Sequence, residues 1–302
     1  MRRVLLATDG SEFAEHAAEF LSLLPRDGEL ELTVVTVLEA PYINSRYPTL
    51  GSMQSAVKVQ KARAEESLKR IEQIFDGAAV SLRNIVREGE RGVAIAQVAK
   101  EQAADLIVLG ARGHSAVSRL LLGSTSDFVA THAHCSVLIV RPTKPLTSNQ
   151  PLRVAIGYEE TGPAQAALEE FIETPWGSHA EVDVVSVLSF VDGFLLDVDR
   201  DTAKSLANEE SQSALDQLKQ AGIEATAHLV EDDHVGEGLL VFAIERDCDL
   251  IVMGETPRNF LGRILLGSTS RYVLRHAPCS VWITRNRVVR GLDKRTRQAT
   301  SP

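Results

Sequence analysis

Short apolar runs alternate with helical stripes along the whole chain. Residues 106–109 are apolar without alternation, which is typical of a strand covered on both faces in a parallel sheet. Leu68, Ile71 and Phe75 fall on one stripe at helical spacing. In the first half we expect strands near residues 3–8, 31–38, 80–86, 105–110 and 136–141, with helices over 12–24, around the Leu68 stripe, over 94–102 and from Ser124 onward. This order predicts a doubly wound α/β sheet.

The whole pattern occurs twice. The residues Asp-Leu-Ile-Val at 105–108 recur at 249–252, and residues 121–126 recur at 265–270. Such self-similarity indicates an internal duplication. We therefore expect an α/β protein of two tandem doubly wound (Rossmann-like) domains, each with a five-stranded parallel sheet. Their expected bounds are 1–143 and 151–286, with a linker between Pro142 and Pro151.

Composition and charge narrow the class of protein. The formal net charge of −9 argues against nucleic acid as a partner. Basic residues gather from Arg285 onward, and we interpret 287–302 as a basic disordered tail, or otherwise as a docking arm. Three cysteines are too few for a disulfide framework, which favours a reducing compartment. No signal peptide or membrane-length apolar run is recognisable, so we expect a cytoplasmic protein with no membrane partner.

The strongest candidate chemistry follows the fourth strand. Gly110 is followed after two residues by Gly113 and, after nine more, by Gly123, Ser124 and Thr125 at the start of a helix. Glycine lets the backbone approach a ligand, and we expect Gly113 to adopt a positive φ and expose its N–H. The N-terminus of the following helix attracts anions, which favours a phosphate. Arg112, His114 and Arg119 in the same loop can add positive charge, although Arg119 fits a solvated surface position equally well.

Other interpretations of these residues stay open. The glycines can be turn residues only, and Ser124 can be a simple N-cap. Ala7, Thr8 and Asp9 end the first strand at the same edge, where Asp9 can bind a ribose or base or can cap the helix at Glu12.

The sequence shows no clear metal-binding or catalytic set. His132, His134 and Cys135 are metal-ligand types without a partner cluster, and we favour no metal site there. We expect Cys135 and Cys279 to be small core residues. The motifs of P-loop and dinucleotide-binding proteins are missing from the sequence.

With these motifs the chain resembles the universal stress protein family, in a tandem form, up to about Arg285. The ATP-binding branch of that family carries the glycine spacing found at Gly110, Gly113, Gly123 and Ser124. The resemblance implies adenine held by main chain at Val37 near Asp9, and ribose beside Gly110. It places the phosphates at Gly113, His114, Gly123, Ser124 and Thr125. ATP is the implied ligand, with ADP or AMP as alternatives and Mg²⁺ as a companion of ATP.

The second copy departs from this pattern. It keeps Val187, Gly254, Gly267, Ser268 and Thr269, but Pro257 replaces the middle glycine and Glu159 replaces the aspartate. Proline offers no N–H to a phosphate. Glu255 replaces Ala111, and we expect its charge near the phosphates, where Arg258 and Arg263 can partly compensate. The second site is therefore expected to bind nucleotide weakly or not at all.

The function that follows is a cytoplasmic stress-response regulator that binds an adenine nucleotide in its first domain and acts as a sensor or adaptor for an unidentified protein. We expect a binding module rather than an enzyme, because only Asp9 is an evident carboxylate at the site. A slow ATPase, or autophosphorylation on Ser124 or Thr125, is the first alternative. The second is an adaptor with a non-nucleotide ligand near Met253, Phe260 and Leu261. The resemblance also implies an intrachain pseudo-dimer about a pseudo-two-fold axis through the last strands, and homodimers are an open alternative.

Overall fold

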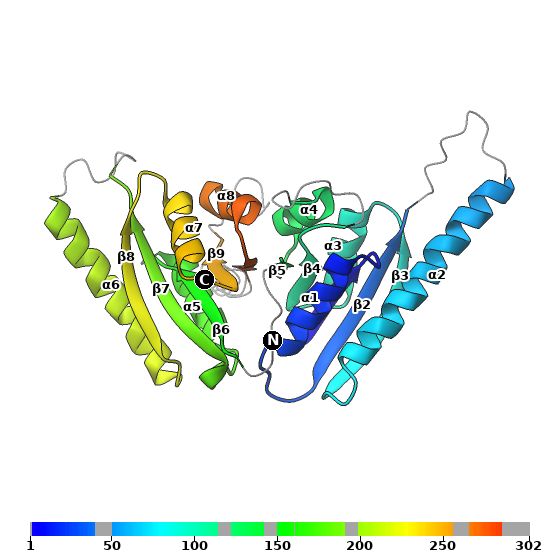
Figure 1. The fold of residues 1–302 in the computed structure, drawn as a ribbon, viewed down its shortest axis with the longest axis horizontal. Coiled ribbons are helices and arrows are strands. Elements are labelled where there is room, and N and C mark those ends of the chain that lie inside the picture. The colour runs from blue at the N-terminus through cyan, green and yellow to red at the C-terminus, as the bar shows by residue number, and fades with distance from the viewer. Residues whose placement is uncertain are drawn as a thin grey trace, which may run out of the picture. The chain divides into compact units, whose positions relative to one another are not determined.

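A computed structural model describes residues 2–39, 50–113, 122–141, 150–159, 161–190, 199–255 and 266–285, with the side chains of 50–57 left out. The chain forms two compact units that divide within its fifth strand (Figure 1). Among the described residues, no helix combines the length and apolarity that crossing a membrane requires.

The first unit is a doubly wound α/β sheet. Its strands run in the order β3-β2-β1-β4-β5, and β1 pairs in parallel with both β2 and β4. Strand order reverses between β1 and β4, so the carboxyl ends of these two strands form the switch point where ligands of such sheets bind. The elements are β1 (Arg3–Thr8), α1 (Glu12–Leu23), β2 (Leu30–Leu38), α2 (Leu50–Ile74), β3 (Val80–Glu88), α3 (Arg91–Glu101), β4 (Leu106–Gly110), α4 (Ser124–His132) and β5 (Ser136–Val140).

The second unit repeats this topology. Its strand order, β8-β7-β6-β9-β10, corresponds one to one to that of the first unit. The fold class expected from the sequence is therefore confirmed in both halves. The elements are β6 (Leu152–Gly157), α5 (Gly162–Ile172), a short 3₁₀ helix η1 (Gly177–His179), β7 (Ala180–Leu188), α6 (Arg200–Gln220), β8 (Ala225–Glu231), α7 (Val235–Glu245), β9 (Leu250–Gly254), α8 (Ser268–His276) and β10 (Ser280–Thr284).

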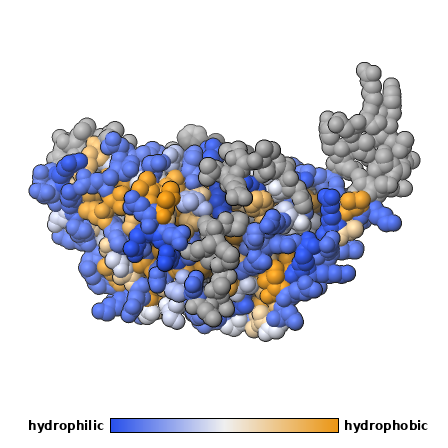
Figure 2. Space-filling view, in the orientation of Figure 1, coloured by the Kyte–Doolittle hydropathy of each residue, from blue (hydrophilic) through white to orange (hydrophobic). Residues whose placement is uncertain are grey.

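The core lies on both faces of each sheet. In the first unit α1 packs against α2, whereas α3 packs against α4 and β2. Consecutive residues of β1, such as Leu5 and Leu6, are both fully buried, which explains why the central strands show no alternation. The outer faces of α2 and α6 are largely hydrophilic (Figure 2).

The buried stripe of α2 differs from the expected one by one position. Ile71 and Phe75 are buried as expected, but Ser67 is fully buried where Leu68 is half-buried. The Ser67 hydroxyl lies 2.8 Å from the hydroxyl of Thr8, so a polar pair inside the core fixes the rotation of the helix.

The repeated aspartate of the Asp-Leu-Ile-Val motif closes the amino edge of each sheet. Asp105 Oδ2 accepts hydrogen bonds from the backbone N–H groups of Arg3 (3.0 Å) and Arg2 (3.2 Å), and Asp249 Oδ2 accepts one from Arg153 (2.9 Å). Burial by itself would raise the pKa of Asp105, but these backbone donors and the Arg3 guanidinium outweigh it and hold the pKa below its ordinary 3.8. This motif is structural and lies away from the carboxyl ends of the strands.

None of the three cysteines forms a disulfide and all three are buried, which confirms the core role expected for Cys135 and Cys279. Burial also raises the pKa of the Cys248 thiol to about 12, which favours the neutral thiol over the nucleophilic thiolate. The expected basic tail, 287–302, lies outside the described residues. Arg285, which the sequence grouped with it, is instead 1% exposed and belongs to the core.

Candidate functional site

A cavity of about 90 Å³ lies at the carboxyl ends of β1, β2 and β4 in the first unit. Ten residues of the sequence-predicted site line it: Ala7, Thr8, Asp9, Val37, Gly110, Arg112, Gly113, Gly123, Ser124 and Thr125. The other two candidates, His114 and Arg119, lie outside the described residues. No pattern in the sequence marked the remaining lining residues as part of the site, and these are Ala14, Val35, Arg91, Ile95, Leu109 and Ser126.

Helix α4 points an uncapped N-terminus at this cavity. Gly123 is the N-cap, with φ −68° and ψ 151°, and it has no side chain to accept the first N–H groups of the helix. Its own N–H donates to the carbonyl of Ala111 at 2.8 Å, which holds the turn against the end of β4. Ser124 is exposed and is the first helical residue, so its interpretation as an N-cap is wrong. The helix start therefore presents N–H groups and hydroxyls suited to an anion.

Gly113 leaves room for Asp9. Its φ lies outside the left-handed region, so the positive φ expected from the sequence is wrong. A Cβ at this position would instead overlap Oδ2 of Asp9. Any residue other than glycine must displace that carboxylate.

Asp9 also organises the start of α1. Its Oδ1 accepts a hydrogen bond from the Ser11 N–H at 3.0 Å, which is an Asx-type turn. The N-cap itself is Ser11, whose hydroxyl accepts from the N–H of Ala14 at 3.3 Å. Asp9 therefore has a local structural role through Oδ1, and its second carboxylate oxygen, Oδ2, lies beside Gly113.

Gly110 is required by helix packing. A Cβ there would stand 2.7 Å from the carbonyl oxygen of Phe13 in α1, and a Cβ on Gly254 would likewise overlap the carbonyl of Pro163 in α5. The carbonyls of both glycines accept a serine hydroxyl, from Ser126 at 2.8 Å and from Ser270 at 3.2 Å. These shared features build the fold in both units, so their presence in the second unit is no sign of a ligand site.

Two arginines line the cavity. Arg112 is buried, and its guanidinium carbon lies 5.6 Å from the centre of the Phe13 ring. Arg91, the first residue of α3, forms an ion pair with Glu39, with 2.9 Å between Nη2 and Oε2. No motif in the sequence marks Arg91 or Glu39.

The corresponding region of the second unit is filled differently. Tyr158 stands where the first unit has Thr8, and its buried side chain donates a hydrogen bond to Gln165 Oε1 at 3.0 Å. Glu159 is exposed, Val187 is half-buried, and Gly267 caps α8 without a side chain, leaving Ser268 exposed and Thr269 half-buried. Pro257, Arg258, Phe260, Leu261 and Arg263 lie outside the described residues, and Met253 is a core residue.

Glu255 does not face a phosphate site, contrary to the expectation from sequence. It is 2% exposed and pairs with the buried Arg285. Burial raises the pKa of the Glu255 carboxyl above its ordinary value even though the Arg285 guanidinium opposes that shift. Glu255 is therefore paired with a buried cation inside the core and contributes no negative charge to a phosphate site.

The histidine and cysteine cluster after α4 is engaged in local structure. The His132 ring stacks on Phe128 at 4.1 Å, and its Nδ1 lies 2.9 Å from the Phe128 carbonyl oxygen. Cys135 is buried, while His134 is half-buried.

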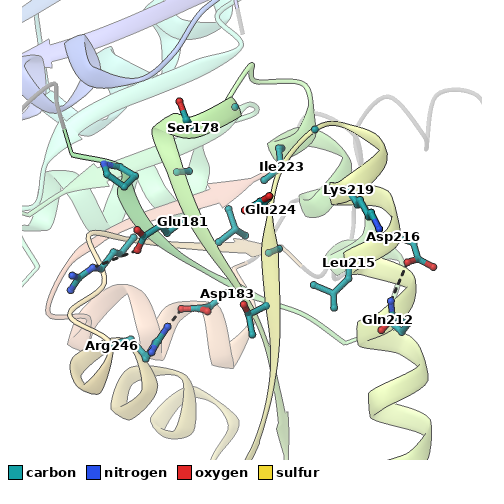
Figure 3. A pocket seen from close by; sticks show the side chains of 18 of the residues that line it. Ser178, Glu181, Asp183, Gln212, Leu215, Asp216, Lys219, Ile223, Glu224 and Arg246 are labelled. Atoms are coloured by element: carbon teal, nitrogen blue, oxygen red, sulfur yellow. Dashed lines mark hydrogen bonds and ion pairs between the residues drawn. The ribbon is translucent and has the colours of Figure 1, made fainter.

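A larger cavity, of about 1510 Å³, lies at the amino ends of β6, β7 and β8 in the second unit. Asp183 and Arg246 point toward each other across its wall (Figure 3), with 3.4 Å between Oδ2 and Nε. Asp183 Oδ1 also lies 2.8 Å from Nε2 of His228. Because these charges are matched within the wall, and because the cavity opens at the edge opposite the switch point, it is a poor candidate for the main site.

A model of the universal stress protein family matches residues 1–141 and again residues 152–285. The chain belongs to the universal stress protein family. One relative, a universal stress protein of Methanocaldococcus jannaschii, is 28% identical over 144 residues, which cover 47% of this chain and 84% of the relative. Another, from Synechocystis, is 32% identical over 152 residues, or 46% of this chain and 97% of the relative.

The fold of this universal stress protein is also found in a solved structure. A crystal structure of a universal stress protein from Archaeoglobus fulgidus superposes with a TM-score of 0.66 at 22% identity, covering 94% of this chain and 98% of that one. Identity at that level supports the shared tandem fold alone.

Proposed function

We propose that the first domain binds an adenine nucleotide, with ATP as the principal ligand, and that the protein acts as a nucleotide-dependent sensor or adaptor in the stress response. The observation that carries this proposal is the single cavity that gathers ten predicted residues at the uncapped start of α4. Apolar side chains from β2 and α3 line one part of the cavity, and the start of α4 contributes N–H and hydroxyl groups that can donate hydrogen bonds to a phosphate. A purine attached to a phosphate chain matches that division.

The chemistry of the lining fits each part of the nucleotide. Val35, Val37 and Ile95 provide an apolar surface for the base. Gly110 and Asp9 lie where the ribose would pass, and the Asp9 carboxylate can accept hydrogen bonds from the ribose hydroxyl groups. The N-terminus of α4, with Ser124 and Thr125, would hold phosphate oxygens. The cavity is smaller than the roughly 300–1,000 Å³ of most ligand pockets, so we expect the exposed Ser124 to move outward on binding.

Binding is favoured over catalysis at this site. Asp9 is the one carboxylate among the described residues that line the cavity, and its Oδ1 already accepts the Ser11 N–H. Phosphoryl transfer at useful rates needs a carboxylate for Mg²⁺ and a further group to position the nucleophile. Slow hydrolysis or autophosphorylation on Ser124 or Thr125 is the alternative that the test must separate from binding.

The second domain is proposed to have lost this activity. The bulky buried Tyr158 takes the place of Thr8, and the sequence places Pro257 where the first domain has Gly113. We therefore expect each chain to bind one nucleotide.

Equilibrium dialysis with two preparations of ATP, labelled in the adenine ring or at the γ-phosphate, tests the proposal. We expect both labels to be retained equally, with neither free phosphate nor phosphoprotein accumulating. Retention of the ring label with release or transfer of the γ-label would establish an enzyme. Retention of neither label would refute nucleotide binding.

A further inference from the structure

Arg91 occupies a distinct position in the cavity of the first domain. It is the first residue of α3, its side chain is 45% exposed, and it is the second arginine of the lining besides the buried Arg112. Its guanidinium is held by the carboxylate of Glu39, the residue that follows β2. The ion pair thus joins the end of β2 to the start of α3 beside the cavity.

The β2 and α3 side of the cavity forms an apolar slot with this ion pair at its outer end. Val35, Val37 and Glu39 alternate along β2 and its extension, so they share one face of the strand. Arg91 and Ile95 are four residues apart and share one face of α3, which packs on β2. A flat ring inserted between Val37 and Ile95 would therefore have the Arg91 guanidinium beside it.

This slot lies apart from the end of the cavity at which the N-terminus of α4 could bind a phosphate. Strand β1 lies between β2 and β4, so the end of β2 stands about 10 Å from the end of β4. The uncapped start of α4 follows β4, whereas Arg91 pairs with Glu39 at the end of β2, although the next residue, Gly92, packs on Phe128 of α4. Arg91 is thus on the side of the base, although its charge would by itself suggest a phosphate ligand.

The second domain lacks both members of the pair. Val235 begins α7 where Arg91 begins α3, and Ser189 stands in place of Glu39. The Ser189 hydroxyl donates to the carbonyl of Asp233 at 3.0 Å, which fixes the same corner without any charge. The ion pair is therefore not needed to join these two elements, and it is present in the domain that retains the full glycine set.

We propose that Arg91, oriented by Glu39, stacks on the base of the bound nucleotide and so sets the orientation of the base in the slot. The inference rests on the proposed function of the same site. A guanidinium is planar and weakly hydrated, so it can cover the face of an aromatic ring while its edge stays bonded to a carboxylate. Glu39 is a positioning residue in this arrangement, and the recognised class of ligand is an aromatic nucleoside with or without phosphates.

Titration with adenosine, AMP, ADP and ATP separates base contact from phosphate contact. We expect Arg91→Ala to weaken all four ligands by a similar factor, about fivefold to thirtyfold. Arg91→Lys should recover only part of the affinity, because an ammonium group cannot stack as a plane. Glu39→Gln should give a smaller loss, again independent of the number of phosphates.

Arg87→Ala is the matched control, because Arg87 of β3 forms a comparable strand-to-helix ion pair with Glu101 of the same helix, α3, without being a lining residue of the cavity. It should leave all four affinities unchanged. A loss that grows with each phosphate, or no loss in Arg91→Ala while the wild type binds, would overturn this inference alone. Failure of the wild-type protein to bind any of the four ligands would overturn the proposed function as well.

Discussion

Gly113 and Asp9 act as a pair, because the glycine leaves the space that the carboxylate fills. Oδ1 of Asp9 is held by the Ser11 N–H, which limits how far the side chain can swing away from an added Cβ. The pair also distinguishes the two halves of the chain. Gly110 has a counterpart in Gly254 that meets the same packing need, whereas the sequence gives Gly113 and Asp9 the counterparts Pro257 and Glu159.

A double-mutant cycle tests this coupling. We expect Gly113→Ala to destabilise the first domain by about 1–3 kcal/mol in the wild-type background, through the clash with the carboxylate. The cost should fall by at least about 0.5 kcal/mol when Asp9 is already alanine, as measured by urea unfolding. Gly123→Ala is the control, since its Cβ would face the Ala111 carbonyl at 3.3 Å and so should not couple to Asp9. Strictly additive effects for Gly113 and Asp9 would contradict the geometry.

The residues of the site were predictable from sequence where a motif marks them, but their physical roles were only partly so. The glycine spacing identified Gly110, yet the carbonyl of Phe13 that requires it comes from a helix about a hundred positions earlier. Glu255 was placed near a phosphate because its partner Arg285, which directly follows the next strand, could not be recognised in advance. Pairings between distant positions depend on packing, and a single sequence does not encode them as a local pattern.

Helices α4 and α8 begin in the same way, with a glycine N-cap and an exposed serine as the first helical residue. Glycine costs a helix only a few tenths of a kcal/mol relative to a capping side chain, and it leaves the first N–H groups available. An acidic side chain at the first helical residue, in place of the serine, would interact favourably with the helix dipole but would repel a phosphate.

Ser124→Asp should therefore change stability and binding in opposite directions. We expect the melting temperature to stay the same or rise slightly, while ATP affinity falls by about tenfold or more. Ser268→Asp, the same change at the start of α8, should have the same effect on stability and none on ATP affinity. Thermal unfolding and ATP titration of the two variants provide the measurement. Equal losses of affinity in both would contradict a site confined to the first domain.

Most helices and strands were predictable from the hydrophobic periodicity of the sequence. The differences between expected and observed bounds explain why one residue of the cavity was missed. Strand β1 has its expected bounds, and the apolar run at 106–109 lies within β4 as expected. Helix α3 begins at Arg91, before the expected Ala94, because Glu90 is its N-cap and accepts the N–H of Gly92 at 3.3 Å. The added first turn carries Arg91, so a boundary error of three residues concealed a lining residue of the cavity.

At the scale of the whole molecule, one topology occurs twice and the two copies differ at the switch point. Both units share the strand order, the aspartate at the amino edge and the glycine that admits the first helix. They differ in the residues that would touch a ligand, where Thr8 and Arg91 correspond to Tyr158 and Val235. The shared set maintains the fold, and the differing set is the basis for proposing nucleotide binding in the first domain alone.

The central claim, one functional nucleotide site per chain, is tested most directly by calorimetric titration of the wild-type protein with ATP. We expect a single class of site with a stoichiometry of one per chain. Two equivalent sites per chain would contradict the proposed loss of nucleotide binding in the second domain, and the absence of any binding heat at several temperatures would contradict the proposed site itself.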